Sequence, residues 1–274
     1  MSILEAIILG IVEGLTEFLP VSSTGHLTLM EGLLGLPVDD RSITGFTAVI
    51  QIGAILAVLL YFRGDIARIA VAWGRGLVNR EARTFDYRFG WYVVAGSLPI
   101  GIVGFLGQDL IAGPLRSLWV VAAALILWSA VMVWGERGAT QARGEPQTTL
   151  RDVLIIGVVQ CAALVPGVSR SGATISAGLL LGLDRVTATR LSFFLAIPAL
   201  TAAGLYELPR ALDQGVGLVP TAVATIVSFV VAYASIAWLL KFVAGHSITA
   251  FVPYRVVLGV LVAVLLATGV LQAT

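Results

Sequence analysis

Two short polar strings interrupt otherwise apolar stretches of this chain, and each carries side chains that could bind or cleave a phosphate group. The first covers residues 22–26 and reads SSTGH, and the second covers residues 166–174 and reads PGVSRSGAT. Hydroxyl groups and an imidazole can attack phosphorus or move protons, and a guanidinium binds phosphate oxygens in pairs. The chemistry indicated by both strings is therefore anion binding and phosphoryl transfer.

Arg170 lies between two apolar runs, where a cation needs an anionic partner because insertion costs about 2.5–3.5 kcal/mol. Ser169, Ser171 and Thr174 place hydroxyl groups around it. The Pro-Gly pair at 166–167 breaks the preceding helix, so the next helix begins here with free N–H groups and a positive dipole end. Helix N-termini of this kind bind phosphate, and an arginine adds charge-assisted bonds. We therefore expect this string to bind phosphate.

Glu13 and Glu17 are four residues apart in an apolar helix, so their carboxylates share one face. Two carboxylates this close repel each other unless a positive group lies beside them. Arg170 is one candidate and a divalent cation is another, because Mg²⁺ is usually held by one or two carboxylates together with phosphate oxygens and water. An ion pair that only joins Arg170 to Glu13 or Glu17 is the simpler alternative, but it leaves the neighbouring hydroxyl groups unexplained.

His26 follows the hydroxyl groups of the first string, whereas His246 lies in a loop with Lys241. A histidine can attack phosphorus itself or act as a general base and acid, and a serine needs such a base to become nucleophilic. Ser23 and His26 are therefore alternative nucleophiles, and both remain open. Gln51, in the middle of an apolar stretch, is either a hydrogen-bonding partner of this site or a helix–helix contact.

The composition determines where such a site can lie. Of the 274 residues, 58% are hydrophobic and 12% are charged, and the mean hydropathy is +0.97. Soluble domains are about 45–50% apolar and about 25% charged, so a soluble enzyme and a disordered chain are excluded. A single cysteine excludes a disulfide scaffold, and the net charge of +1 gives no indication of a nucleic-acid partner. The sequence predicts an integral membrane protein.

Six uncharged apolar stretches are long enough, or nearly so, to cross about 30 Å of hydrocarbon as helices. They are Thr44–Phe62, Phe89–Gly107, Leu118–Trp134, Leu191–Tyr206, Pro220–Leu240 and Val256–Leu271. Two further regions, Ile3–Leu36 and Leu150–Leu183, are interrupted by the polar strings, and such breaks are tolerated at membrane depth only inside protein or beside a cavity. We therefore predict an all-α membrane protein that forms a single polytopic domain over residues 1–274, with six transmembrane helices plus two re-entrant helix-loop-helix hairpins.

The two interrupted regions also resemble each other, which predicts an internal repeat over approximately 1–62 and 150–208. At an offset of 147 residues, the matching pairs are Gly10 with Gly157, Val12 with Val159, Ser22 with Ser169 and Gly25 with Gly172. Glu13 then corresponds to Gln160.

The arginines indicate the orientation. If the loop after Phe62 is cytoplasmic, 13 of the 17 basic residues lie inside, as the positive-inside rule favours. The inside segments are then 63–90, 135–152, 184–190 and 241–255. Arg41, Arg116 and Arg210 lie outside, and Arg170 belongs to neither surface. In this arrangement the first hairpin enters from outside and the second from inside, so the repeat is inverted and both termini face outward.

The strings EGLTEFLPVSSTGH at 13–26 and PGVSRSGAT at 166–174 resemble the two signatures of the undecaprenyl pyrophosphate phosphatase (bacitracin-resistance protein) family. The resemblance covers essentially the whole chain. It implies a multi-pass enzyme of the bacterial plasma (inner) membrane that hydrolyses undecaprenyl diphosphate and so recycles the lipid carrier for cell-wall polymers such as peptidoglycan. It also implies inverted repeats with interdigitated hairpins, a site open to the outer (periplasmic) side, dependence on Mg²⁺ or Ca²⁺, and a homodimer.

This resemblance assigns a role to each residue of the two signatures by its position. The expected catalytic residues are Glu17, Ser23, His26 and Arg170. The expected diphosphate-binding residues are Ser22, Ser169, Arg170, Ser171 and Thr174, and the expected metal ligands are Glu13 and Glu17. The alternative function is a secondary transporter or flippase of polyprenyl phosphate lipids, since repeated halves with broken helices are also typical of transporters.

Overall fold

The computed structural model describes residues 1–36, 41–213 and 216–273, and within them every regular element is helical. The α-helices of this part are α1 (Ile3–Thr16), α2 (Ser23–Leu33), α3 (Arg41–Tyr61), α4 (Arg63–Val78), α5 (Phe85–Leu106), α6 (Gln108–Ala112), α7 (Leu118–Arg137), α8 (Leu150–Gln160), α9 (Arg170–Leu180), α10 (Arg185–Asp213), α11 (Leu218–Gly245) and α12 (Val252–Ala267). Short 3₁₀ turns connect several of them, including η3 (Glu145–Gln147), η4 (Cys161–Leu164) and η5 (Ile248–Phe251). The all-α prediction is confirmed for the described residues.

Five segments are long and apolar enough to cross a membrane, and they lie in α5, α7, α10, α11 and η5 with α12. A sixth is obtained if α3 is counted together with α4, from which it is bent by 75°. The protein is therefore a multi-pass membrane protein with five or six candidate spans among its described residues. Segment 63–90, predicted as a loop, contains the helix α4, which packs against α5 and whose Ile66 and Ile69 contact the core.

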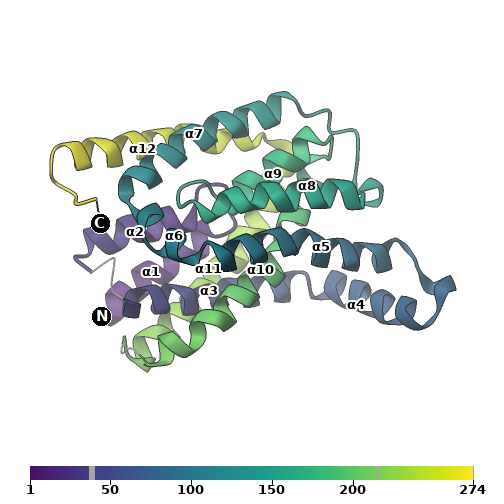
Figure 1. The fold of residues 1–274 in the computed structure, drawn as a ribbon, viewed down its shortest axis with the longest axis horizontal. Helices are drawn as coiled ribbons and strands as arrows, with labels where there is room; N and C mark the ends of the chain where they lie inside the picture. The colour runs from purple at the N-terminus through teal and green to yellow at the C-terminus, as the bar shows by residue number, and fades with distance from the viewer. Residues whose placement is uncertain (37–40, 214–215, 274) are drawn as a thin grey trace.

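The two interrupted regions fold as helix–loop–helix pairs, α1 with α2 and α8 with α9. The first helix of each pair packs closely against a helix distant in sequence: α1 against α11, and α8 against α5 (Figure 1). Small residues permit both approaches, since a Cβ atom added at Gly10 would lie 2.6 Å from the carbonyl oxygen of Ala224, and one added at Gly157 would collide with the backbone of Gly96. Gly10 and Gly157 thus make corresponding contacts in the two pairs.

Ion pairs hold together the loops at one end of the molecule. Arg190 contacts both Asp65 of α4 and Glu145 of η3, and Arg185 pairs with Glu136. The N–H of Ile248 also donates a hydrogen bond to Glu136. Segments 63–90, 135–152 and 184–190 therefore meet at one end together with η5, as the orientation argument requires. The N-terminus and the end of α12 lie at the left of Figure 1, away from the tip of the α4–α5 hairpin at the right.

One arginine of this group was misassigned. Arg255 was placed on the same face as the loops, but it is fully buried in the first turn of α12. Its side chain binds backbone carbonyl groups inside the protein, which compensates for its removal from water. The side chains of Arg41 and Arg210, expected on the opposite face, lie outside the described part of the chain.

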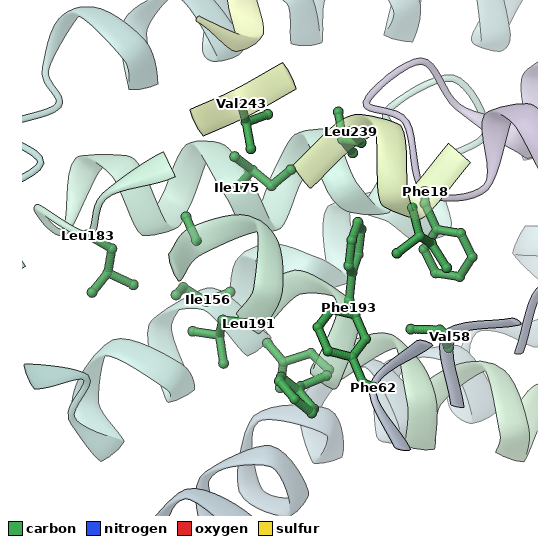
Figure 2. Packing of buried hydrophobic residues seen from close by; sticks show 14 of the residues in the cluster. Phe18, Val58, Phe62, Ile156, Ile175, Leu183, Leu191, Phe193, Leu239 and Val243 are labelled. Atoms are coloured by element: carbon green, nitrogen blue, oxygen red, sulfur yellow. The ribbon is translucent and has the colours of Figure 1, made fainter. Parts of the chain in front are cut away.

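The largest cluster of buried apolar side chains extends from Phe18, in the first broken region, to Ile175 and Leu183, in and after the second, as Figure 2 shows. Phe18 packs edge-to-face on Phe193 with ring centroids 5.1 Å apart, and Phe193 continues to Phe62 at 6.1 Å. Such aromatic contacts add to the stabilisation from buried area. Because Phe18 directly follows Glu17, this packing fixes the backbone that carries the carboxylate.

Candidate active site

The loops that break the two hairpins, the first loop (residues 17–22) and the second loop (residues 161–169), end on serines of the same unusual conformation. Ser22 has φ 78° and Ser169 has φ 77°, values that non-glycine residues rarely adopt. Each Oγ caps the helix that follows, accepting a hydrogen bond from Gly25 at 3.4 Å or from Gly172 at 3.2 Å. Strained backbone of this kind concentrates at functional sites.

The two loops are bonded to each other. The N–H of Gly167 donates to Ser22 Oγ at 3.0 Å, and Ser171 Oγ donates to the carbonyl oxygen of Leu19 at 2.9 Å. Gly167 has φ +98°, and a Cβ atom there would lie 2.5 Å from the carbonyl oxygen of Val121, so only glycine fits this position. The polar strings, whose Ser22 and Ser169 are 147 positions apart in the sequence, therefore form one connected unit.

The buried side chain of Arg255 donates hydrogen bonds to the backbone of both loops. Its Nη1 donates to the carbonyl oxygen of Pro20 at 3.0 Å, and its Nη2 donates to those of Gly167 and Val168 at 2.8 and 3.1 Å. Its Nε donates to Ser129 Oγ at 3.2 Å. Buried carbonyl groups need such donors, and here one side chain serves both loops.

Glu17 lies at the centre of the polar cluster and is almost fully buried. Its Oε1 accepts a hydrogen bond from Arg170 Nη2 at 3.1 Å, which forms a buried ion pair between the two hairpins. Its Oε2 accepts from Ser23 Oγ at 2.6 Å and from Gln51 Nε2 at 3.4 Å. The structure thus brings Glu17, Ser23 and Arg170 together, and Gln51 is a hydrogen-bonding partner of the site.

The guanidinium of Arg170 retains a free donor. Its Nη1 donates to the carbonyl oxygen of Ser192 at 3.1 Å, but its Nε is buried without a hydrogen-bond partner among the described residues. Arg170 is also the first residue of α9, where the leading N–H groups have no partner within the helix. An anion at this position would meet both kinds of donor.

The hydroxyl groups around Arg170 are engaged within the protein. Thr174 Oγ1 donates to the carbonyl oxygen of Arg170 at 2.8 Å and lies 2.7 Å from Ser192 Oγ. Ser169 Oγ lies 3.1 Å from Ser171 Oγ. These contacts hold the first turn of α9 in place, while direct contact of these hydroxyl groups with a diphosphate stays a prediction.

His26 lies one turn after Ser23 on α2, so the two side chains share a face of that helix. Its Nδ1 lies 2.7 Å from the carbonyl oxygen of Ser22, and its Nε2 lies 2.6 Å from the hydroxyl group of Tyr254. A carbonyl oxygen can only accept, so Nδ1 carries the proton of the neutral ring and Nε2 is free to accept one.

Glu13 was expected to bind a metal together with Glu17. Its side chain is 1% exposed, and its Oε1 is buried without a hydrogen-bond partner among the described residues. It lies close enough to Glu17 and Arg170 to interact with both charges. No group of three or more metal-ligating side chains occurs in the described residues. Two carboxylates with an unsatisfied oxygen fit a divalent cation whose remaining ligands are phosphate oxygens and water.

Sequence reasoning missed two residues of this site, Tyr254 and Arg255, which lie next to each other in α12. Arg255 lies just before the apolar run Val256–Leu271, and a cation next to such a run was the available signal. Tyr254 contacts His26 through its hydroxyl group, and the two residues are 228 positions apart. No local sequence pattern around Tyr254 indicates this contact.

Comparison with known proteins places this geometry in context. The model of the family described as bacitracin resistance protein BacA matches residues 6–261. The chain is 60% identical over 275 residues to undecaprenyl-diphosphatase 1 of Streptomyces coelicolor, covering all of this chain and 99% of that protein. It is 62% identical over 270 residues to undecaprenyl-diphosphatase 1 of Streptomyces avermitilis, covering 98% of each. It is 53% identical over 278 residues to an undecaprenyl-diphosphatase of Mycobacterium sp. (strain KMS), covering the full length of both.

Proposed function

The chain belongs to the bacitracin resistance protein BacA family, and from this premise we propose how it removes the terminal phosphate of undecaprenyl diphosphate. The products are undecaprenyl phosphate, the reusable lipid carrier of cell-wall synthesis, and inorganic phosphate. The observation that carries the mechanism is the buried contact of Glu17 with both Ser23 and Arg170, next to an unpaired Arg170 Nε.

The terminal phosphate binds at the first turn of α9. Arg170 donates to its oxygens through Nε, and the leading N–H groups of the helix add further hydrogen bonds. Arg255 binds the carbonyl oxygens of Gly167 and Val168, just before α9, and has no ion pair to a carboxylate among the described residues, so its positive charge also favours an anion here. The polyprenyl tail stays in the lipid.

Ser23 is the nucleophile favoured by the geometry. Its hydroxyl group already donates to Glu17 Oε2 at 2.6 Å, so that carboxylate can take the proton as Oγ attacks the terminal phosphorus. The bond between phosphorus and the bridging oxygen breaks, and undecaprenyl phosphate leaves with the bridging oxygen. Ser23 then carries the phosphoryl group.

His26 completes the turnover. Its Nε2 takes a proton from water, whose oxygen attacks the phosphorus. The bond from phosphorus to Ser23 Oγ breaks, and Oγ recovers its proton from Glu17. Nε2 releases its own proton to the solvent as the inorganic phosphate leaves. Arg170 stabilises the charge on the phosphoryl oxygens in both steps, because phosphoryl transfer depends mostly on positioning and electrostatics.

Glu13 and Glu17 would hold a divalent cation, Mg²⁺ or Ca²⁺. Bound there, it would neutralise charge on the diphosphate oxygens. The unpaired Oε1 of Glu13 supports this assignment.

We also propose the arrangement in the membrane. Six transmembrane helices and two re-entrant hairpins cross or enter the bacterial inner membrane, with the site open to the outer side. The chain contains inverted repeats over approximately 1–62 and 150–208, each followed by further spans. The corresponding serines and glycines of the two hairpins support the repeat. Single cysteines at Ser2 and at Asn79, introduced into a Cys161→Ala background, test the orientation: only the first should react with an impermeant thiol reagent added outside. The opposite labelling would reverse the orientation.

The decisive test of the reaction is phosphate release from undecaprenyl diphosphate by the purified protein. The wild type should release inorganic phosphate, and acid-quenched samples of His26→Ala should accumulate a phosphoryl group on the peptide that contains Ser23. A phosphoryl group on no residue, with normal turnover of Ser23→Ala, would contradict the nucleophile assignment. Absence of phosphate release by the wild type would contradict the activity itself.

A further inference from the structure

The first turn of α12 places a tyrosine against the histidine of the site. Tyr254 Oη lies 2.6 Å from His26 Nε2, and the two rings stack with centroids 5.6 Å apart at an interplanar angle of 15°. This turn is held in place by Arg255, the neighbouring residue, whose buried hydrogen bonds tie it to both loops. The position of Tyr254 relative to His26 is therefore part of the packed structure.

The direction of this hydrogen bond follows from its neighbours. Since Nδ1 of the neutral His26 ring carries the proton toward the carbonyl oxygen of Ser22, Nε2 must accept, and the Tyr254 hydroxyl must donate. The lone pair that should take a proton from water is thus occupied by Tyr254. Water can reach Nε2 only when the hydroxyl moves away.

Tyr254 has room for this movement. Half of its surface is exposed, and His26 is the one hydrogen-bond partner of its hydroxyl group in the described part of the chain. Once rotated, the phenol can donate its hydrogen bond to another acceptor. The oxygens of the terminal phosphate, which is bound beside Ser23, are the acceptors that the substrate brings to this place.

We propose that Tyr254 is a catalytic residue that exchanges its hydrogen bond from His26 Nε2 to an oxygen of the terminal phosphate when the substrate is bound. This inference rests on the proposed function. Substrate binding thereby frees Nε2 for water, and in its absence the histidine stays masked. Tyr254 forms no covalent bond to the substrate, and its proton remains on the hydroxyl group throughout.

Tyr254→Phe is the direct test, because phenylalanine keeps the stacked ring and removes only the hydroxyl group. We expect kcat to fall by about 10²-fold or more, as for the loss of one donor to a transition-state oxygen, with a smaller change in KM. Tyr233→Phe is the matched control, since Tyr233 is also partly exposed but contacts Tyr61 instead, and it should keep wild-type kcat. In a His26→Ala background, Tyr254→Phe should have a smaller effect than in the wild type.

A second readout does not depend on turnover. The chain has two histidines, so modification by diethyl pyrocarbonate, measured by mass spectrometry, can follow His26 against His246 as an internal reference. We expect Tyr254→Phe to speed the modification of His26 several-fold and leave His246 unchanged. Unchanged labelling together with unchanged kcat would overturn the proposal while leaving the phosphatase activity in place. If the wild type released no phosphate, the proposed function would fail, and the labelling would still decide whether Tyr254 masks His26.

Discussion

Arg170 Nη2 lies 3.1 Å from Glu17 Oε1, so two residues 153 positions apart form an ion pair that joins the two broken hairpins. Both side chains are nearly buried, and the removal of one partner from such a pair leaves an uncompensated charge. The pair therefore affects both the assembly of the site and its chemistry, and the two roles can be separated by experiment.

Replacement of Arg170 by lysine should preserve the charge and lose the fork of donors. We expect the variant to fold and to release phosphate with kcat lower by about 10²–10³-fold, because a transition-state donor is lost. Phosphate release and thermal unfolding are measured together. Arg80→Ala, at an exposed position in the loop after α4, is the control and should match the wild type. A folded Arg170→Lys variant with wild-type kcat would remove Arg170 from the mechanism.

Replacement of Ser23 and of Ser22 by alanine should affect different properties, the first the catalytic rate and the second the stability. Ser23→Ala should lower kcat by about 10²–10⁴-fold with little change in stability, because its hydroxyl exchanges a proton with Glu17. Ser22→Ala should lower the free energy of unfolding by about 0.5–2 kcal/mol, because its Oγ caps α2. Thermal unfolding and single-turnover kinetics distinguish the two outcomes, and a larger loss of stability in Ser23→Ala would contradict them.

Chelation of divalent cations should abolish phosphate release, and Mg²⁺ or Ca²⁺ should restore it. We expect Glu13→Gln to raise the metal concentration for half-maximal activity by about tenfold or more, because a carboxylate ligand becomes neutral. Glu5→Gln is the control on the same helix, since Glu5 lies in the first turn and caps it through Ser2. Equal metal titrations for Glu13→Gln and Glu5→Gln would place the cation elsewhere.

Arg255→Met should destabilise the protein strongly. The change leaves the carbonyl oxygens of both loops without their buried donor. Each unsatisfied group lowers the free energy of unfolding by about 1–3 kcal/mol. The temperature of unfolding in detergent is the measurement. Arg151→Met, at an exposed position on α8, should unfold like the wild type. A wild-type unfolding temperature for Arg255→Met would show that the loops hold together without this residue.

The contact between Arg143 and Asp152 should stabilise the protein in a pH-dependent way. Burial raises the pKa of Asp152, but the hydrogen bonds from Arg143 and Thr149 lower it by more than burial raises it. The net shift of the pKa is therefore downward. A carboxyl group with a lowered pKa in the folded state stabilises the protein above its unfolded pKa of about 3.9. That stabilisation is lost as the pH falls through the folded pKa.

Asp152→Asn should therefore unfold at a lower temperature than the wild type at pH 7, and the difference should shrink as the pH falls below about 4. Asp109→Asn, at an exposed position on α6, should show no such dependence. A gap between wild type and Asp152→Asn that stays constant with pH would disprove this role for the carboxylate.

How far the sequence predicts this structure depends on whether the signal is local. Apolar length and the two polar breaks predicted an all-helical membrane protein with hairpins that bring Glu17, Ser23 and Arg170 together, because the cost of polar groups in hydrocarbon applies to each segment separately. The same reasoning read segment 63–90 as a loop, since its arginines hid the apolar face with which α4 packs on α5.

The identity of the partners was decided only by the tertiary structure. From the sequence, either Glu13 or Glu17 could pair with Arg170. In the structure Arg170 pairs with Glu17, and one carboxylate oxygen of Glu13 has no hydrogen-bond partner among the described residues. Arg255 was assigned to a loop surface and proved to bind both loops from inside, and Tyr254 was not singled out at all. Hydrogen bonds form between groups that the fold brings together, over as many as 235 positions here, and no local pattern records them. The sequence by itself therefore determined that charged groups had to meet inside the membrane protein, and the fold determined which of them did.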